Sequence, residues 1–375
     1  MSLLLRNGSD MLLVGSNQGT VFVVQKGQCD DSPHGSSFEL VRQVDLAKEL
    51  GPSEALFNNM FDVDGNIWFT TSGFSGTATS TTLGFVTRDG LVRKEAIPGQ
   101  VVENGIAVSG GTVFVVTGPP RQSQQKEDGF LSAYTLSSGN GTSLEQLWRL
   151  PYNAGRLLKP GTFARGSGTT PALLGDDFVV VTDNDDQQLH MVIAHQKQRL
   201  GGEGQVVCKV PIFERGTGAA DVRPTVHFDG RFYRVVVLNS YEAPPMTFSS
   251  TPGFKINGGW NNRTGMTGGI VSVEVSADGQ ACSVAWTSSL KAIMAPILST
   301  SSGLFYTYVQ EPELASQGVY VWYVVALDWR SGKEVWRLKA GTGGVFNDNA
   351  LAASMGPDGT FYQPVFSGTV MVKDG

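Results

Sequence analysis

The chain has few of the residues on which enzymes build metal, redox or nucleophilic centres. Its 375 residues include 3 cysteines and 4 histidines. No two cysteines form a CxxC pair, and the histidines show no metal-ligand spacing. The sequence also contains no GxSxG elbow, HExxH helix, Walker loop or GxGxxG turn. It therefore carries no signature of zinc, nucleotide-dependent or serine-hydrolase chemistry.

A surplus of basic residues is also lacking. Lysine and arginine number 28 against 34 aspartates and glutamates, and the net charge is −6. A nucleic-acid partner is not expected, because it would need a basic face to meet its phosphates. No apolar run is long enough to cross a bilayer, and the leucines within residues 1–7 are too few for a signal-peptide core. We expect a cytoplasmic protein with no membrane span; a secreted chain whose leader has been removed would look the same.

The three cysteines, Cys29, Cys208 and Cys282, are too scattered to form a disulfide framework. Free thiols in a cytosolic chain are the plainer interpretation. The alternative is a single bridge, since Cys208 and Cys282 begin comparable outer strands in neighbouring repeats.

What the chain does contain is a repeated turn and strand. Hydrophobic residues make up 41% of the sequence, and 47 glycines accompany them. Asp-Gly, Gly-Gly and similar turns precede runs of β-branched and aromatic residues, which is typical of β-hairpins. The seven turn-and-strand segments are 9–14, 64–69, 110–115, 176–181, 229–233, 302–306 and 358–362.

This repeated turn-and-strand pattern predicts an all-β fold. The segments recur at roughly 45 to 75 residues, and each is followed by a second alternating run. A four-stranded sheet cannot bury both of its faces alone, so the sheets must stack in a closed ring. We predict a single β-propeller domain over residues 1–375, with seven blades of four antiparallel strands around a central channel. An eight-bladed ring, six blades with an irregular seventh, and two packed β-sandwiches remain open.

The two ends of the predicted ring lead to a further expectation. The last repeat ends at Gly375 without a fourth strand. Ser2 to Leu5 would either complete that blade or form the innermost strand of the first blade. Both arrangements would join the termini and hide a sheet edge.

Function in a propeller usually belongs to the loops that surround the channel on one face. Short polar segments precede the predicted innermost strands, and two loops, 152–167 and 240–268, are unusually long. Arg223 is the most informative residue, because small or amide residues occupy its place in other blades. Its guanidinium would hold an oxyanion or a carbonyl in the channel; a salt bridge to Asp221 or Glu103 is the alternative. We name Arg223, Asn104 and Asn349 as candidate catalytic hydrogen-bond donors.

Further residues near the predicted mouth are candidates for binding a substrate. Several are aromatic or apolar and would make a hydrophobic wall, and the others are polar. They are Phe57, Asn59, Glu103, Arg165, Thr170, Tyr241, Trp260, Lys291, Met294, Phe346 and Asp348.

A calcium ion is the alternative use of the polar residues at the mouth. Calcium takes several carboxylate and amide oxygens as ligands. Asn59, Glu103, Asn104, Asp348 and Asn349 could supply them. The acidic segment 183–186 lacks the glycine and distal glutamate of an EF-hand, so it is interpreted as a solvated hairpin turn.

Two segments resemble a known set of propellers. Residues 165–184 (RGSGTTPALLGDDFVVVTDN) and residues 322–336, which end in ALDWRSGKEVW, resemble propellers with pyrroloquinoline-quinone-like repeats. The resemblance extends over most of the chain from about Glu103 onward. Quinone dehydrogenases of that class carry a tryptophan-docking motif in each blade and often a vicinal cysteine pair. This chain has neither, which argues against a bound quinone.

Within that set, the chain is similar to the fungal hetero-Diels–Alderases of tropolone–sesquiterpenoid biosynthesis. The similarity implies a cofactor-independent cycloaddition between a tropolone quinone methide and a humulene-type polyene in secondary metabolism. Such a reaction needs two partners held in orientation and donors aimed at one oxygen. No catalytic residue is carried over from the family. A calcium-dependent lactonase or related hydrolase, and a non-catalytic propeller that binds a ligand or a protein, are the alternatives.

Overall fold

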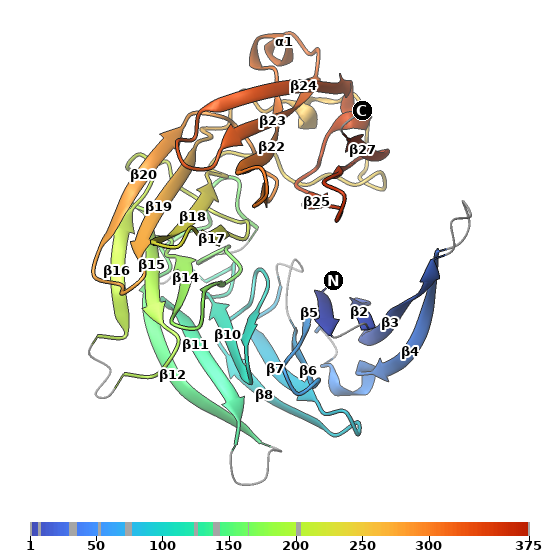
Figure 1. Ribbon diagram of the computed structural model, residues 1–375, viewed down its shortest axis with the longest axis vertical. Helices are drawn as coiled ribbons and strands as arrows, with labels where there is room; N and C mark the ends of the chain where they lie inside the picture. The colour runs from blue at the N-terminus through green and yellow to red at the C-terminus, as the bar shows by residue number, and fades with distance from the viewer. Residues whose placement is uncertain are drawn as a thin grey trace.

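Seven antiparallel sheets follow one another around a common axis, so the chain forms a seven-bladed β-propeller (Figure 1). This computed structural model describes residues 2–6, 9–29, 36–51, 54–71, 77–123, 127–137, 143–163, 165–199 and 204–373. The predicted all-β class and the predicted number of blades are confirmed. Among the described residues, the longest helix has five residues, and no helix is long and apolar enough to cross a membrane.

Each blade is a meander that runs from the channel outward. The first three blades contain β1 (Ser2–Arg6), β2 (Ser9–Gly15), β3 (Thr20–Cys29) and β4 (Ser36–Asp45); β5 (Leu56–Phe61), β6 (Ile67–Thr71), β7 (Ser80–Val86) and β8 (Val92–Pro98); and β9 (Ala107–Ser109), β10 (Thr112–Thr117), β11 (Asp128–Leu136) and β12 (Leu144–Asn153). The fourth and fifth contain β13 (Ala172–Leu174), β14 (Phe178–Thr182), β15 (His190–His195) and β16 (Val206–Pro211); and β17 (Thr225–Phe228), β18 (Phe232–Leu238), β19 (Ile270–Ser276) and β20 (Cys282–Ser288). The last two contain β21 (Ile297–Ser299), β22 (Leu304–Gln310), β23 (Val321–Asp328) and β24 (Glu334–Thr342); and β25 (Ser354–Met355), β26 (Phe361–Val365) and β27 (Gly368–Val372). Four short helices lie between strands: η1 (Ala47–Glu49), η2 (Gly259–Asn261), α1 (Pro312–Ser316) and η3 (Gly344–Phe346).

The hydrophobic core is divided among the seams between blades. All five residues of β6 and of β14 are buried, whereas β8 on the outer rim is largely exposed. One core cluster joins Val180 and Ile193 of the fourth blade to Val235 and Val273 of the fifth. Because middle strands such as β6 and β14 bury side chains on both of their faces, their blades need a neighbour on each side.

The first and last blades resolve the alternatives for the chain ends. β1 pairs with β2, with Leu3 opposite Leu12, so the N-terminal segment is the innermost strand of the first blade. The seventh blade has three strands among the described residues, where four were predicted. The other six blades have the predicted four strands.

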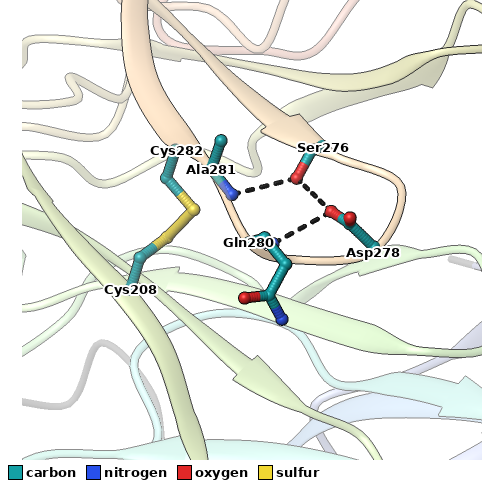
Figure 2. Close-up of a disulfide and its surroundings, with 6 residues drawn as sticks. All are labelled: Cys208, Ser276, Asp278, Gln280, Ala281 and Cys282. Atoms are coloured by element: carbon teal, nitrogen blue, oxygen red, sulfur yellow. Dashed lines mark hydrogen bonds between the residues drawn. A yellow bond between two sulfur atoms is a disulfide. The ribbon is translucent and has the colours of Figure 1, made fainter.

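A disulfide joins the outer strands of the fourth and fifth blades. Figure 2 shows Cys208 of β16 bonded to Cys282 at the start of β20, with 6.6 Å between their Cα atoms. The tight turn before Cys282 is braced by the Ser276 hydroxyl, which donates to Asp278 and accepts from the Ala281 N–H. The interpretation of these two cysteines as free thiols is therefore wrong. The positions of the cysteines in the sequence could not show whether they are bonded, because the bond depends on the outer strands of two blades lying side by side.

Removal of this bridge should destabilise the propeller. The bond joins residues 74 apart, and a closed loop of that length restricts the unfolded chain by about 4 kcal/mol. We expect the double variant Cys208→Ser/Cys282→Ser to lose about that free energy of unfolding in urea titrations. A reductant should bring the native chain to the level of the variant and leave the variant unchanged. Equal stability of the two chains under oxidising conditions would contradict the prediction.

Candidate functional site

Two cavities lie along the propeller axis and share one residue, Arg223. The mouth cavity has a volume of about 490 Å³ and an apolar wall that includes Phe163, Met246 and Ile293. The channel cavity has a volume of about 590 Å³ and is lined mainly by the innermost strands of the second to sixth blades. Both volumes are large enough for an organic molecule of moderate size.

Equivalent positions in successive blades form the mouth. Four residues before the innermost strand, the third to seventh blades carry Glu103, Gly168, Asp221, Ile293 and Ala350, which we call the mouth ring. Two residues before the same strands they carry Gly105, Thr170, Arg223, Ala295 and Ala352, which we call the channel ring. All members of the mouth ring except Gly168 line the mouth cavity. The members of the channel ring divide between the cavities: Gly105 and Thr170 line the channel cavity, Ala295 and Ala352 line the mouth cavity, and Arg223 lines both.

The two acidic members of the mouth ring meet across a glycine. Glu103 and Asp221 come from the third and fifth blades, both are buried, and their carboxyl groups lie close enough to interact. Gly168 of the fourth blade lies between them, and a Cβ atom there would come within 2.1 Å of Asp221 Oδ1. The contact between the carboxyl groups thus requires glycine in the intervening blade. A hydrogen bond between these two carboxyl groups would require a proton on one of them.

The surroundings favour that shared proton. Burial raises the pKa of Asp221 to about 7, although Glu103, the Phe163 N–H and the nearby charge of Lys159 oppose the rise. The Phe163 N–H donates to Glu103 Oε1 at 3.3 Å. Lys159 does not bond to the pair, because its ammonium donates to the carbonyls of Asp185 and Gly218. The pair can therefore gain or lose a proton near neutral pH.

Arg223 is placed to bind an oxygen atom of a ligand. It is exposed on the channel ring, where the other members are glycine, threonine and alanine. No hydrogen bond or ion pair joins its guanidinium to another described residue, so the expected alternative of a salt bridge to Asp221 or Glu103 is absent from the described part of the chain. All of its donors remain available for a carbonyl, carboxylate or phosphate.

Asn104 holds the mouth together through backbone carbonyls. Its amide N–H groups donate to the carbonyls of Gly168 and Asp221, at 2.9 and 2.8 Å. Its Oδ1 accepts from the Thr170 hydroxyl at 3.0 Å. These bonds tie the third, fourth and fifth blades together directly beside the carboxyl pair. Donation by Asn104 to a substrate stays a prediction, and it would require one of these bonds to open.

The long loop 240–268 roofs the mouth cavity. Ala243, Pro244 and Met246 of this loop line the cavity. The loop is anchored in the seventh blade at two points. Thr247 and Asn349 exchange two hydrogen bonds, of 3.0 and 2.8 Å. The predicted donor Asn349 is therefore bonded to the roof.

The second anchor is a buried ion pair. Arg263 donates to Asp348, both side chains are almost wholly buried, and the guanidinium lies 4.7 Å from the centre of the Trp322 ring. The Arg263 N–H also donates to Gln310 Oε1 at 3.0 Å. Asp348 was predicted to bind substrate, and the structure pairs it with the roof.

Some of the other predicted binding residues line one of the two cavities, and the rest contact neighbouring parts of the protein. Asn59 and Thr170 line the channel cavity, and Glu103 and Asn104 line the mouth cavity. Arg165 is buried and donates to the carbonyls of Gly155 and Ser123, so its guanidinium supports loop 152–167. Outside the lining of both cavities lie Phe57, Arg165, Tyr241, Trp260, Lys291, Met294, Phe346, Asp348 and Asn349.

Each of these outlying residues has a structural contact, made by the side chain or, for Tyr241, by the backbone. Met294 and Phe346 pack in the core between the last two blades, and Phe57 packs against a core cluster of the second and third blades. Trp260 contacts Phe254 and Phe366, Lys291 donates to the Thr264 carbonyl, and the Tyr241 N–H donates to Asn239 Oδ1.

The residues proposed as calcium ligands are dispersed. Asn59 lines the channel, Glu103 contacts Asp221, and Asp348 is paired with Arg263. Within the described residues, no group of three or more His, Cys, Asp or Glu side chains could hold a metal ion. In the acidic turn, Asp183 bonds to His190 and Asp185 accepts from backbone N–H groups, as in a hairpin turn. The calcium site stays a hypothesis.

Sequence reasoning missed Asp221 as a functional residue and missed the role of Gly168. The available signal was alignment by repeat: Glu103, Gly168 and Asp221 each lie four residues before an innermost strand. The apolar members of the roof, such as Met246, carry no such signal, because their loop has no counterpart in other blades.

Known proteins resemble the chain in fold. No protein-family model matches it. An uncharacterised protein from Archaeoglobus fulgidus is 25% identical over 287 residues, which cover 70% of this chain and 50% of that protein. The chain thus spans half the length of that curated relative.

Solved structures also resemble the chain in fold. The Dos1 propeller matches with a TM-score of 0.53 at 10% identity, over 96% of this chain and 75% of that one. A protein from Lactobacillus plantarum matches with a TM-score of 0.52 at 11% identity, over 97% of this chain and 95% of that one. A Bacteroides fragilis protein provisionally named a 6-phosphogluconolactonase matches with a TM-score of 0.50 at 10% identity, over 98% of this chain and 94% of that one. At such low identities these similarities support the propeller fold alone, and none of these names includes a hetero-Diels–Alderase.

Loss of the roof anchor should destabilise the chain. Asp348→Ala leaves the Arg263 guanidinium buried without its charged partner, which typically costs about 3 to 5 kcal/mol. We expect a matching loss in urea titrations and faster proteolysis within 240–268. The control is Asp358→Ala, which removes an exposed carboxylate from the same blade and should cost clearly less than Asp348→Ala. Equal effects of the two substitutions would contradict the assignment.

The carboxyl pair should make stability depend on pH. The pKa of Asp221 is raised from 3.8 to about 7, so the folded chain retains a proton that the unfolded chain releases in this range. The free energy of unfolding should therefore fall as pH rises from about 4 to about 7. Melting temperatures across this range should show a smaller fall for Asp221→Asn. Asp229→Asn, on an exposed turn of the same blade, should keep the native slope. An unchanged slope in Asp221→Asn would contradict the shared proton.

Proposed function

We propose that the chain is an enzyme that acts on a largely apolar small molecule bearing a carbonyl or similar oxygen. The observation that carries this proposal is the buried carboxyl pair, Glu103 and Asp221, in the wall of an apolar cavity that an unpaired guanidinium also lines. A structural role does not require a proton shared near neutral pH. General acid–base catalysis does, because it works best when the pKa lies near the working pH.

The chemistry follows from the residues around the mouth cavity. The protonated carboxyl group of the pair would donate to the substrate oxygen, and Arg223 would stabilise negative charge developing there. The carboxylate that remains could take a proton from carbon or from water and so restore the pair. The apolar wall would exclude water and strengthen both interactions. None of these steps requires a cofactor.

The narrower reaction we propose is the hetero-Diels–Alder cycloaddition between a tropolone quinone methide and a humulene-type polyene. Its support is the resemblance in sequence, together with the apolar mouth cavity and its donors. A hydrogen bond from the pair to the quinone-methide oxygen would make the diene more electrophilic. The cavity would hold the two reactants in orientation, which can supply several kcal/mol.

Hydrolysis of a lactone is the second candidate, because a buried carboxylate beside a guanidinium also suits that reaction. The carboxylate would remove a proton from water, and Arg223 would stabilise the tetrahedral oxyanion. The Bacteroides fragilis protein of similar fold bears a lactonase name, but its 10% identity adds no evidence about activity. A calcium-dependent form of this reaction should lose activity in EDTA and regain it with calcium.

The disulfide bears on the compartment in which such an enzyme would work. Bridges such as Cys208–Cys282 persist mainly in oxidising environments. This supports the secreted alternative over the cytoplasmic one.

Activity assays on both substrate classes should test the proposal. Asp221→Asn and Glu103→Gln should each lower kcat by about 100-fold or more, as loss of general acid–base catalysis does. Arg231→Gln, an exposed arginine of the same blade, should have little effect. Full activity of Asp221→Asn on every substrate that the native chain converts would contradict the proposal.

The pH profile separates the two reactions. Cycloaddition needs the protonated pair, so its rate should fall as pH rises through about 7. Hydrolysis needs the carboxylate, so its rate should rise over the same range. A profile that is unchanged in Asp221→Asn would remove the pair from the mechanism.

A further inference from the structure

The channel cavity contains a buried acceptor for which the proposed reaction has no use. Asn59 of β5 is 8% exposed and lines this cavity, and its Oδ1 accepts no hydrogen bond from the described residues. Its Nδ2 lies against Gly15 of β2, where a Cβ atom would come within 2.3 Å. This packing turns the nitrogen toward the first blade. An unbonded buried acceptor is unfavourable unless a donor comes from a ligand or from water.

Arg223 adds a positive charge and hydrogen-bond donors to the same cavity. It lines the channel cavity as well as the mouth cavity, and its guanidinium has no partner among the described residues. The channel thus offers five unoccupied N–H donors on a fixed positive charge. A carboxylate or a phosphate meets that geometry with two parallel hydrogen bonds.

The walls between these two groups also suit a hydroxylated ligand. The innermost strands β5, β9, β13, β17 and β21 pair with a neighbour on one side only, so their other edge faces the channel. That edge presents backbone N–H and C=O groups that a hydroxyl can bond in either direction. Thr225 and Thr300 line the same cavity, and the Thr225 hydroxyl, which donates to the Pro296 carbonyl, can still accept a hydrogen bond. Apolar residues such as Met60 and Leu298 would contact the carbon skeleton.

We propose that the channel cavity is a second binding site, for a polyhydroxylated organic anion. The anionic group lies on Arg223, and a hydroxyl group donates to Asn59 Oδ1. The site is distinct from the carboxyl pair, which lines the mouth cavity and not the channel cavity. The inference therefore stands whether or not the mouth cavity catalyses the proposed reaction.

Isothermal titration calorimetry at low salt tests the inference with four compounds. Gluconate and glucose 6-phosphate carry both an anionic group and hydroxyl groups, hexanoate carries only the charge, and sorbitol carries only hydroxyl groups. We expect one or both of the hydroxylated anions to bind more tightly than hexanoate and sorbitol. The relative affinities of gluconate and glucose 6-phosphate then distinguish a carboxylate from a phosphate. Failure of the native chain to bind either hydroxylated anion would overturn the inference.

Two substitutions at exposed positions test the location without threatening the fold. Arg223→Gln should weaken binding of the hydroxylated anion by about 10- to 100-fold, as loss of charged hydrogen bonds does. Thr300→Trp should fill the channel and abolish binding. Arg231→Gln is the matched control and should bind as the native chain does. Binding that survives both Arg223→Gln and Thr300→Trp unchanged would overturn the site.

Asp221→Asn separates this inference from the proposed function. We expect it to bind the hydroxylated anion normally, because it alters the mouth cavity. Binding lost in Asp221→Asn but kept in Thr300→Trp would place the ligand at the mouth and overturn the inference. A catalytically silent native chain that still binds the anion through Arg223 would support the inference and count against the proposed function.

Discussion

The structure depends on one constraint: a blade with two apolar faces is stable only between two neighbours. The seams between blades therefore carry the hydrophobic core, as where Val180 and Ile193 meet Val235 and Val273. The ring that satisfies this constraint brings equivalent residues of different blades to one height on the axis. Glu103 and Asp221 are 118 positions apart in the sequence, yet their carboxyl groups lie close together because both lie four residues before an innermost strand.

The fold could be predicted because its signals are local. The turn at Asp64 and Gly65 and the run from Ile67 to Thr71 lie within a few residues of each other, and the same pattern recurs in other blades. The site could be predicted only in part, because it depends on the relative heights of separate blades. The innermost strands that set these heights are short, and β25 has two residues, so periodicity locates them poorly. Arg223 and Glu103 were found by their place in the repeat, whereas Asp221 was considered only as a partner for Arg223.

Polar residues near the mouth look alike in sequence but differ in what they bond. Asp348 is neutralised by Arg263, and Arg165 is satisfied by backbone carbonyls, so both stabilise loops. Asp221 is buried to a similar degree, but its partner is another carboxyl group. Burial raises the pKa of both acids, but the Arg263 guanidinium opposes the rise at Asp348, whereas the partner of Asp221 is itself an acid that can compete for the same proton. That distinction requires the identity of each partner, which only the three-dimensional arrangement supplies.

The glycine between the two acids has a consequence for how this propeller can evolve. Propellers are built from repeated blades, so a blade can be duplicated as a unit. The arc from the third to the fifth blade constrains such an event, because the acids are in contact only with one intervening blade that carries Gly168. A duplicated blade within that arc would part the two carboxyl groups. The contact between the two acids therefore fixes the number of blades in this arc.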